Sequence, residues 1–581
     1  MRLNWFQPPA RGARRFGRAM HRLGPTFVAS PVRRIVQAIA LLLFCGLFFW
    51  MCWPYGDADY AAAMQRREKI PAESFLMLDP LLSLSTAVAA QAWIWALAWG
   101  GSMLAVCLLI PRGFCGYLCP LGTIIDLVDW SLGQRISRFR IPPQRTGWWI
   151  HLKYYLLAAT LVASTMGVLV SGFVAAIPVV TRGLQFTLAP LQLGLFKGFY
   201  LVPPMNAGQW LSIAMFVLVL ALGLLRRRFW CRYVCPTGAI FSIANWLRLS
   251  QRRVTADCTG CGKCVRICPF DPINADYSTR PNECTFCQTC GGVCPAGAIE
   301  FVPRWEPLRS GLAETDVGAG AIRVSRRGVL AAAAGGAGLA LGVNRLLPAA
   351  ALSAGGPIVR PPGSVPEEQF LQLCIRCGEC FKACPNNVLQ PVGLEHGLDA
   401  LWTPKVVADW SGCEQSCNNC GQVCPTGAIR PLPIAEKRAA RMGLAVIDQQ
   451  TCLPYAGSSD CRMCVDECVS AGYNAIEFRM VGVELDGEGL PAEGSGRQVP
   501  VVLAEACIGC GLCQTRCRAI NVKQEKLLRR SAIVVVAGEG KEDRIAAGSY
   551  LQLRQQRNRL SPASAPPTTA PGDGYLPDFV R

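Results

Sequence analysis

The sequence predicts an α-helical membrane domain of four helices plus a fifth hydrophobic segment, joined to two small cysteine-rich domains of mixed α and β structure. Two observations lead to this fold class. Of the 581 residues, 51% are hydrophobic and only 17% are charged, and the apolar residues form several runs long enough to cross a membrane. In addition, 24 of the 31 cysteines fall into short groups with repeated spacing. A single soluble domain is therefore disfavoured.

The positive charge is unevenly placed along the chain. The net charge is +19, with 35 Lys and Arg against 15 Asp and Glu in residues 1–354, and 23 against 24 in residues 355–581. The arginines of the first part flank apolar segments and do not form a patch on a nucleic-acid-binding fold. The charge therefore indicates membrane topology, and nucleic acid is not an expected partner.

Four apolar stretches predict the helices of a membrane domain over residues 31–247. A basic tail, residues 1–30, precedes them and contains no acidic residue. Arginine-rich segments also follow the second and fourth stretches, so the positive-inside rule places both ends of this domain in the cytoplasm, as a multi-pass protein of the inner (cytoplasmic) membrane. The four stretches are residues 35–53, about 88–110, about 148–174 and about 209–225.

Two further segments have apolar character. Residues 175–199 are interrupted by Pro178 and Pro190, and we expect them to be interfacial or re-entrant on the outer side. After a linker, residues 306–328, the hydrophobic segment 329–354 follows the pair Arg326-Arg327.

This arginine pair resembles a twin-arginine export signal, which implies the twin-arginine export machinery as a partner. The alternative is an ordinary fifth membrane helix. Either one carries residues 355–581 into the periplasm and leaves residues 248–305 in the cytoplasm. The last residues, 531–581, are rich in Pro, Ser, Thr and Ala towards their end, and we expect a flexible tail.

Residues 248–305 contain two complete C-x2-C-x2-C-x3-C-P runs. In bacterial ferredoxins with this spacing, three close cysteines hold one 4Fe-4S cube and the fourth serves the neighbouring cube. Paired C-x2-C motifs also make zinc sites, but two complete runs only sixteen residues apart disfavour zinc. We therefore expect one cluster on Cys258, Cys261, Cys264 and Cys294, and a second on Cys284, Cys287, Cys290 and Cys268.

Residues 355–530 contain four further quartets of cysteines. The first is complete; the second has one extra residue in its first gap; the third has eight residues there and no proline; the fourth lacks only the proline. A nested pairing between the outer quartets is an alternative to exchange of fourth ligands between neighbours. Exchange between neighbours predicts four sets: Cys374, Cys377, Cys380 and Cys424; Cys413, Cys417, Cys420 and Cys384; Cys452, Cys461, Cys464 and Cys517; and Cys507, Cys510, Cys513 and Cys468. About six 4Fe-4S clusters are thus expected in two α+β bacterial-ferredoxin-like domains.

Two C-x3-C-P motifs lie just after the second and fourth predicted helices, at the cytoplasmic face. They contain Cys115 and Cys119, and Cys231 and Cys235. Helical i, i+4 spacing places both sulfurs of a pair on one side of a turn. These thiols can hold a metal or a further cluster, cycle between dithiol and disulfide, or simply pack in the interior. Only three histidines and no C-x-x-C-H sequence are present, so haem is not expected.

With these motifs, residues 31–305 resemble the NapH-type membrane ferredoxin proteins, which are related to the polyferredoxin parts of the NosR and CcoG families. Residues 325–530 resemble the NapG-type, MauM-like exported ferredoxins. The chain is thus similar to a fusion of two proteins that are usually separate. The resemblance implies a quinol dehydrogenase component that passes electrons from quinol to a periplasmic reductase of the nitrate-reductase type, or to its electron carrier.

Two other functions compete with this electron conduit. The first is a maturation factor, as the CcoG resemblance suggests, whose C-x3-C-P thiols bind or reduce a metal such as copper for another oxidoreductase. The second is a membrane scaffold with structural clusters. A quinone site needs polar groups at the membrane edge, and the candidates are Asp79, His151, Lys153 and Arg182, each of which can also be an interface anchor.

Overall fold

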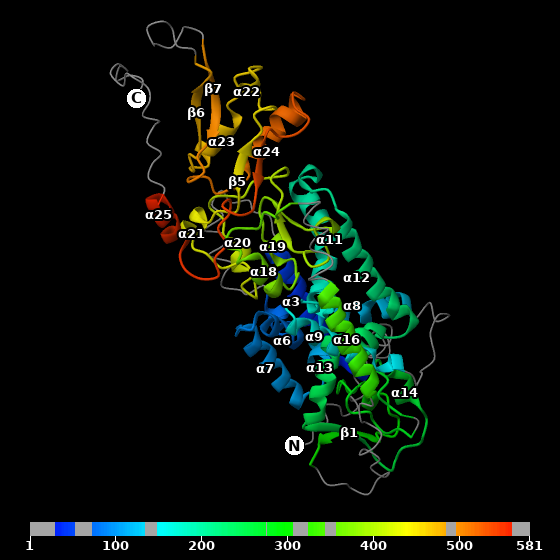
Figure 1. Ribbon diagram of the computed structural model, residues 1–581. Coiled ribbons are helices and arrows are strands. Elements are labelled where there is room, and N and C mark those ends of the chain that lie inside the picture. The colour runs from blue at the N-terminus through cyan, green and yellow to red at the C-terminus, as the bar shows by residue number, and fades with distance from the viewer. Residues whose placement is uncertain are drawn as a thin grey trace.

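The computed structural model describes residues 29–52, 73–133, 148–274, 276–305, 324–342, 356–483 and 495–560. In this part of the chain, a layer of helices separates two domains that contain strands (Figure 1). The domain with β1 lies at one end, and the domain with β5, β6 and β7 lies at the other. The predicted tail up to residue 28, linker residues 306–323, and residues 561–581 fall outside the described residues.

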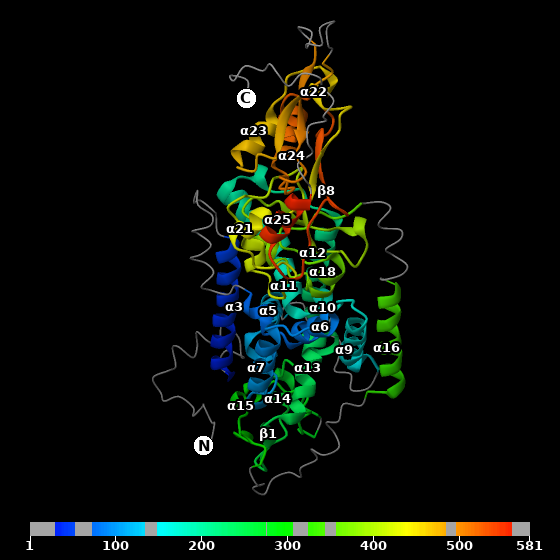
Figure 2. The same ribbon diagram turned by 60° about the vertical axis from the view of Figure 1, so that its left-hand side comes forward.

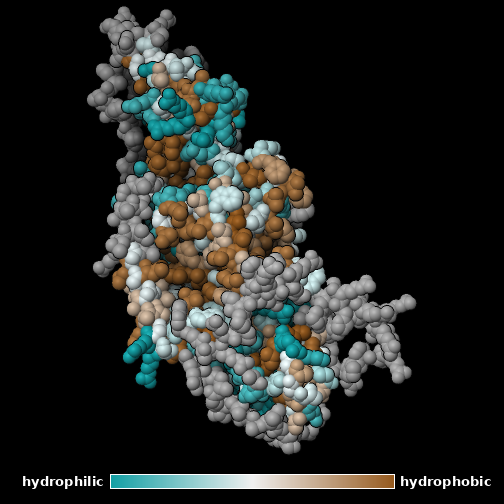
Figure 3. Space-filling view, turned by 90° about the vertical axis from the view of Figure 1, so that its right-hand side faces the viewer, coloured by the Kyte–Doolittle hydropathy of each residue, from teal (hydrophilic) through white to brown (hydrophobic). Residues whose placement is uncertain are grey.

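The helical layer exposes many apolar side chains, which form a broad hydrophobic surface in Figure 3. Within the described residues, two helices are long and apolar enough to cross a membrane by length and composition, α3 and α12. The sequence predicts four such helices, so the structure agrees only in part. The main helices of the layer are α3 (Pro31–Cys52), α6 (Pro80–Ala90), α7 (Ala96–Leu109), α9 (Leu152–Thr165), α11 (Ala176–Lys197) and α12 (Ala207–Leu225).

The other two predicted spans are divided into shorter pieces. In residues 88–110, α6 ends at Ala90 because Gln91 adopts a left-handed conformation, with φ of 50°, and α7 begins at Ala96. In residues 148–174, the turn Trp148–His151 precedes α9, and Gly167 with φ of 79° separates α9 from the short helix α10 (Ser171–Val174). A hydrophobic run does not reveal such left-handed breaks.

The segment expected to be broken by prolines instead forms one helix of 22 residues, α11. Pro178 lies in its first turn, where the backbone N–H has no intrahelical acceptor, so its missing donor costs little. Pro190 lies inside the helix. The helix packs against α12, and Ile177 and Val180 are completely buried. Burial of this apolar face outweighs the cost of the internal proline.

The segment after the arginine pair forms helix α16 (Arg326–Leu341), capped by the Ser325 hydroxyl, which accepts a hydrogen bond from the backbone N–H of Gly328 at 3.0 Å. It packs along α9 at the edge of the layer, as Figure 2 shows. Contact is close at Gly336, where a Cβ atom would lie 2.4 Å from the carbonyl oxygen of Ala159. This packing favours a fifth helix of the layer.

The first cysteine-rich domain is built on two antiparallel strands, β1 (Ser250–Val254) and β2 (Ile299–Pro303), with Ser250 opposite Pro303. Between them lie two short helices, α14 (Lys263–Ile267) and α15 (Thr289–Gly292). The rings of Phe286 and Phe301 pack edge to face, with centroids 5.0 Å apart, beneath the cysteine loops.

In its described residues, 356–483 and 495–560, the second cysteine-rich domain has three antiparallel strand pairs, β3–β4, β5–β8 and β6–β7, with short helices in the cysteine loops. The strands are β3 (Leu389–Pro391), β4 (Pro404–Val406), β5 (Leu444–Ile447), β6 (Ile476–Val481), β7 (Arg497–Val502) and β8 (Ile533–Val536). The helices are α18 (Glu367–Leu373), α19 (Glu379–Lys382), α20 (Asn419–Gln422), α21 (Ile434–Ala439), α22 (Leu453–Ala456), α23 (Met463–Ser470), α24 (Leu512–Cys517) and α25 (Tyr550–Leu560).

This domain extends beyond the predicted boundary at residue 530. Strand β8 pairs with β5, with Ile533 opposite Ile447, and α25 packs against α21. Tyr550 is 1% exposed, and its backbone N–H donates to the Glu436 carboxylate at 2.6 Å. The predicted flexible tail is therefore ordered up to Leu560, because Ile533–Val536 is an apolar run that completes a sheet.

Candidate functional site

The loops of the first cysteine-rich domain turn through left-handed residues next to the cysteines. Gly260, Gly262 and Gln288 have φ of 69°, 66° and 58°, and the last two are the N-cap residues of α14 and α15. This lets a short loop wrap around a bound group while the first turn of each helix faces it.

The same loops bring the cysteines of both runs together. The thiol of Cys268 lies within electrostatic range of the thiols of Cys284, Cys287 and Cys290. Cys294 and Cys264 pack in one apolar cluster. The contacts of Cys268 are those expected if it serves the second run, and the two ligand sets stay a prediction.

The second domain gathers its sixteen cysteines into four groups. In each group, at least one of the first three cysteines of a quartet lies within electrostatic range of the last cysteine of another quartet. Cys424 joins the first quartet, Cys384 joins the second, Cys517 joins the third and Cys468 joins the fourth. These neighbours are those expected for exchange between neighbouring quartets, and the assignment of fourth ligands stays a prediction.

The donor set fits 4Fe-4S clusters. All the cysteines that the structure describes are free of disulfides. Several sulfurs accept hydrogen bonds of the kind that stabilise thiolate ligands: Ala475 N–H donates to Cys468 Sγ at 3.2 Å, and the Asn521 amide donates to Cys461 Sγ at 3.5 Å. Within the described ranges, no three His, Cys, Asp or Glu side chains are arranged to hold one metal ion. A cube, by contrast, takes each sulfur on a different iron.

Two groups of the second domain are joined directly through the backbone. The N–H of Cys413 donates to the carbonyl oxygen of Cys510 at 2.8 Å, and the two thiols interact electrostatically. The groups that contain them are therefore immediate neighbours.

The two C-x3-C-P motifs fold as structural repeats. In each, an arginine with positive φ (Arg112, 50°; Arg228, 52°) precedes a π-helical turn, η2 (Phe114–Leu118) or η7 (Trp230–Val234). The proline then begins helix α8 (Pro120–Val128) or α13 (Pro236–Ala244), where its missing N–H costs little.

The repeats bring Cys115, Cys119, Cys231 and Cys235 together. Cys235 interacts electrostatically with the other three, and Cys231 does so with Cys115. The sequence did not predict that these motifs, which are more than one hundred residues apart, share one site.

Each repeat places its arginine on the other repeat. Arg228 donates to the carbonyl oxygens of Cys115 at 2.7 Å and Gly122 at 3.1 Å. Reciprocally, a Cβ atom at Gly238, which corresponds to Gly122, would lie 3.4 Å from Arg112 Nη2. Two fully buried guanidinium groups thus flank the four thiols. Sequence reasoning missed both arginines, although the shared position before each motif was a visible signal.

Glu283 connects the first cysteine-rich domain to the helical layer. Its carboxylate pairs with Arg112 at 2.8 Å and with Lys153 at 2.6 Å. Burial alone would raise the pKa of Glu283, but Lys153 and Arg112 outweigh that effect and lower it to about 2. Glu283 is therefore ionised at neutral pH and anchors the domain.

Three of the four proposed quinone-site residues have structural partners. Asp79 caps α6 by accepting from Leu81 N–H at 3.0 Å, and Arg182 donates to the carbonyl oxygens of Gly172 and Arg376. Asp79, Lys153 and Arg182 are completely buried, whereas His151 is half-buried beside Tyr154.

A different, apolar cavity of about 570 Å³ lies between α3, α7, η2 and the cysteine loop of residues 286–288. Its wall includes Cys287, Tyr117, Val106 and Ile110. Val106 and Ile110 are 47% and 42% exposed, so the cavity lies at the outer, apolar surface of the layer. Tyr117 Oη donates to the carbonyl oxygen of Phe286 at 2.9 Å at the inner end.

Comparison with family models agrees with this arrangement. A 4Fe-4S binding domain matches residues 91–140 and 209–254, a 4Fe-4S dicluster domain matches residues 373–428, and another 4Fe-4S binding domain matches residues 253–274. The first model covers both C-x3-C-P motifs. Fold and cysteine groups together define an iron–sulfur electron-transfer protein of the ferredoxin type.

Similarity to known proteins identifies the family within this class. The ferredoxin-type protein NapG of Escherichia coli (strain K12) is 37% identical over 183 residues, which are 31% of this chain and 73% of NapG. The methylamine utilization ferredoxin-type protein MauM of Paracoccus denitrificans is 36% identical over 206 residues, 34% of this chain and 84% of MauM. MauN of Methylorubrum extorquens is 30% identical over 200 residues, 33% of this chain and 59% of MauN. No solved structure matches. The chain belongs to the NapG/MauM family of ferredoxin-type proteins, with the match covering about a third of its length.

Proposed function

We propose that this protein takes electrons from quinol at the inner membrane and delivers them to a periplasmic reductase of the nitrate-reductase type. One observation carries the proposal: the helical layer lies between the two cysteine-rich domains (Figure 2), and each of these three parts contains a group of neighbouring cysteines. When bound, 4Fe-4S clusters accept and release single electrons.

The first contact in this series joins the first cysteine-rich domain to the C-x3-C-P site. Tyr117, between Cys115 and Cys119, donates to Phe286 O and interacts electrostatically with Cys284 and Cys287. Gly116 lies so close that a Cβ atom there would be 3.2 Å from the Thr285 side chain. This contact supports direct passage between the two sites.

We assign a seventh cluster to the four C-x3-C-P cysteines. The match to a 4Fe-4S binding domain over both motifs supports this assignment. The two buried arginines support it as well, because four thiolates and a cluster bring net negative charge into an apolar interior, and Arg112 and Arg228 compensate that charge.

The second contact joins the helical layer to the second cysteine-rich domain. Ile375 and Cys377 pack in the same apolar cluster as Cys119 and Cys235. Backbone acceptors hold the two parts together: Arg376 Nη1 donates to Leu169 O at 2.8 Å. This shared core supports a route for electrons across the helical layer. Such a route is needed because two cysteine groups belong to the first cysteine-rich domain and four belong to the second, on the other side of the layer.

The apolar cavity beside Cys287 is the proposed quinol site. Its volume of about 570 Å³ lies within the usual range for organic ligands. Its apolar wall suits the ring and tail of a quinol, and Tyr117 and Gln288 supply polar groups near the cysteine loop. This proposed site differs from the sequence-based candidates, which were Asp79, His151, Lys153 and Arg182.

The proposed membrane orientation follows from the arginine distribution and from α3, α12 and the exposed apolar surface of the layer. The first cysteine-rich domain lies on the cytoplasmic side and the second on the periplasmic side. Export through the twin-arginine machinery is compatible with Arg326 and Arg327 at the start of α16.

A quinol analogue added to the purified, cluster-loaded protein tests the proposal. We expect rapid loss of visible cluster absorbance and the appearance of reduced-cluster EPR signals. Val106→Trp, which fills the cavity, should slow this reduction at least tenfold. Val217→Trp is the matched control, because Val217 is 55% exposed on α12 and lies outside the cavity wall.

The copper-maturation function is the second candidate, and the gathering of four thiols favours it. Absence of reduction by quinol, together with stoichiometric copper binding that is lost in Cys115→Ser/Cys231→Ser, would establish this function instead.

A further inference from the structure

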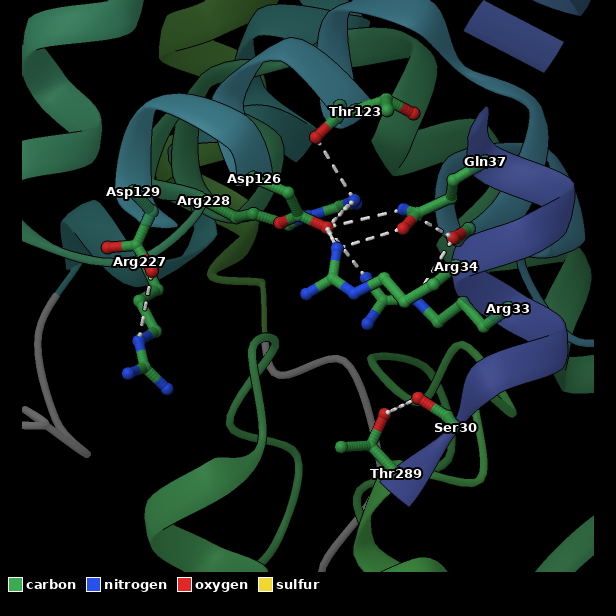
Figure 4. Close-up of polar contacts among 12 residues, drawn as sticks. Ser30, Arg33, Arg34, Gln37, Thr123, Asp126, Asp129, Arg227, Arg228 and Thr289 are labelled. Atoms are coloured by element: carbon green, nitrogen blue, oxygen red, sulfur yellow. Dashed lines mark hydrogen bonds and ion pairs between the residues drawn. The ribbon is translucent and has the colours of Figure 1, made fainter. Parts of the chain in front are cut away.

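A second pocket, of about 330 Å³, lies between the helical layer and the first cysteine-rich domain. One wall comes from the start of α3 and the turn η3 (Asp129–Gly133), and the other from α14 and the residues that follow it. Figure 4 shows the guanidinium groups of Arg33, Arg34 and Arg227 at the layer side of this space. We name it the basic pocket.

The basic pocket has an excess of positive charge. Its lining contains five basic residues, Arg33, Arg34, Arg227, Lys263 and Arg266, and two carboxylates, Asp126 and Asp129. Both carboxylates already form ion pairs with arginines.

Asp126 is shared among three guanidinium groups. It pairs with Arg33 at 2.9 Å, with Arg34 at 3.0 Å and with Arg228 at 2.7 Å, and Figure 4 shows these contacts converging on one carboxylate. Asp129 pairs with Arg227 at 3.2 Å. Two carboxylates therefore face more positive charge than they can neutralise.

One buried donor in the pocket wall has no partner among the described residues. Arg33 is 1% exposed, and its Nε and Nη2 atoms donate to Gly116 O and Asp126, but Nη1 has no hydrogen-bond acceptor there. A buried guanidinium N–H without an acceptor is destabilising, and more so because the group is charged. Such a donor favours an acceptor at this place, and the excess of positive charge in the pocket favours an anionic one.

The adjoining stretches of sequence offer no carboxylate for this role. Residues 1–28, which precede α3, and residues 134–147, which follow η3, contain no Asp or Glu. They contain many arginines and so add positive charge.

The rim of the basic pocket on the layer side is apolar and exposed. Leu127, Trp130 and Leu132 are 52%, 41% and 51% exposed. An anion that fits both the pocket and this rim has a charged head and a hydrophobic tail, and basic pockets at the cytoplasmic ends of helices bind anionic lipid headgroups.

The geometry points to a binding site for a phosphate group, carried by an anionic phospholipid whose acyl chains cover the apolar rim. The phosphate site depends on the pocket itself, whereas its lipid source rests on the membrane placement proposed above. Bound phosphate accepts from Arg33 and Arg34 on one side and from Lys263 and Arg266 on the other. It thereby ties the cysteine-rich domain to the layer beside Pro269 and Val293, which adjoin Cys268 and Cys294.

The test measures lipid retained by the full chain after purification and delipidation in detergent. Native mass spectrometry with added phosphatidylglycerol should show one tightly bound lipid per chain, with at least tenfold preference over phosphatidylcholine. Lys263→Gln/Arg266→Gln should weaken this binding at least tenfold. Arg253→Gln/Arg304→Gln removes the same charge from the same domain outside the pocket and should change binding less than twofold. Unchanged iron content establishes that both variants are folded.

A parallel arm uses inorganic phosphate alone and identifies the source. If the wild type binds phosphate at millimolar concentration and shows no preference for phosphatidylglycerol over phosphatidylcholine, the site is assigned to free phosphate. The proposal is overturned if the two double variants bind each probe equally well. It is also overturned if the wild type binds neither probe. Because this readout involves no electron transfer, failure of quinol to reduce the clusters leaves it unaffected.

Discussion

The guanidinium group of Arg228 donates a hydrogen bond to the carbonyl oxygen of Cys115 at 2.7 Å, so the second C-x3-C-P motif holds the cysteine turn of the first. The same group pairs with Asp126, and both side chains are buried, at 1% and 9% exposure. Because Asp126 also neutralises Arg33, one ion-pair network fixes the cysteine site and the start of α3.

Replacing Arg228 should destabilise the C-x3-C-P site. In Arg228→Lys the charge remains, but an ammonium group cannot reproduce the forked contacts to Asp126, Cys115 and Gly122. Breaking such a buried pair costs about 3–5 kcal/mol. We expect a lower thermal midpoint and the loss of one cluster's worth of iron per chain. The exposed Arg304→Lys is the control, and equal iron content in both variants would contradict the assignment of a cluster here.

A second ion-pair network predicts a pH dependence. Glu367 contacts Arg544 and pairs with Arg360 at 2.5 Å. Burial raises the pKa of Glu367, but the two arginines outweigh that effect and hold it below its ordinary value of 4.5. A lowered folded-state pKa contributes stability above the unfolded value, and this contribution is lost as the pH falls through the folded value.

Glu367→Gln should therefore lower the thermal midpoint at pH 7, and the difference from wild type should shrink as the pH falls below 4.5. The side chain is 40% exposed, so solvent screens the pairs, and we expect an effect of about 1 kcal/mol. The exposed neighbour Glu368→Gln is the control and should be neutral at both pH values. A constant deficit of Glu367→Gln at every pH would contradict the linkage.

Cysteine spacing predicted that the chain binds several 4Fe-4S clusters, because three ligands within a few residues leave the chain little freedom around one cube. Contacts between residues far apart in the sequence could not be predicted from local spacing in this way. No residue near Cys115 in the sequence indicates that Cys231 lies beside it. Likewise, the apolar run Ile533–Val536 predicts a strand but does not indicate that this strand pairs with β5. The expectation that prolines interrupt residues 175–199 was wrong, because tertiary packing of α11 outweighs the tendency of Pro190 to break a helix.

Adjacent glycines in α16 offer a test of its packing on α9. A Cβ atom at Gly336 would lie 2.4 Å from the carbonyl oxygen of Ala159, whereas Gly335 has no atom within 4 Å of such a position. Gly336→Ala should therefore separate the helices and cost about 1–3 kcal/mol. Gly335→Ala should stabilise the helix by up to about 1 kcal/mol through helix propensity. Thermal midpoints of the two variants measure the contrast, and equal shifts would show that α16 is not docked on α9.

The amide of Asn521 tests both the pairing of cysteines and their role in setting potential. Its Nδ2 atom lies 3.5 Å from Cys461 Sγ and 3.6 Å from Cys517 Sγ, and the residue is 5% exposed. These donors stabilise negative charge on the sulfurs, and reduction adds negative charge to a cluster. Asn521→Leu should therefore lower the reduction potential of the cluster that these cysteines hold.

An EPR-monitored redox titration measures this effect. If Cys461 and Cys517 share a cluster, one signal shifts and the others stay; in the nested pairing the two cysteines serve different clusters, so two signals shift. Gln524→Leu, an exposed change near Asn521 whose amide contacts Glu525, is the control and should move none. An unchanged titration of Asn521→Leu would mean that this amide does not act on a cluster ligand.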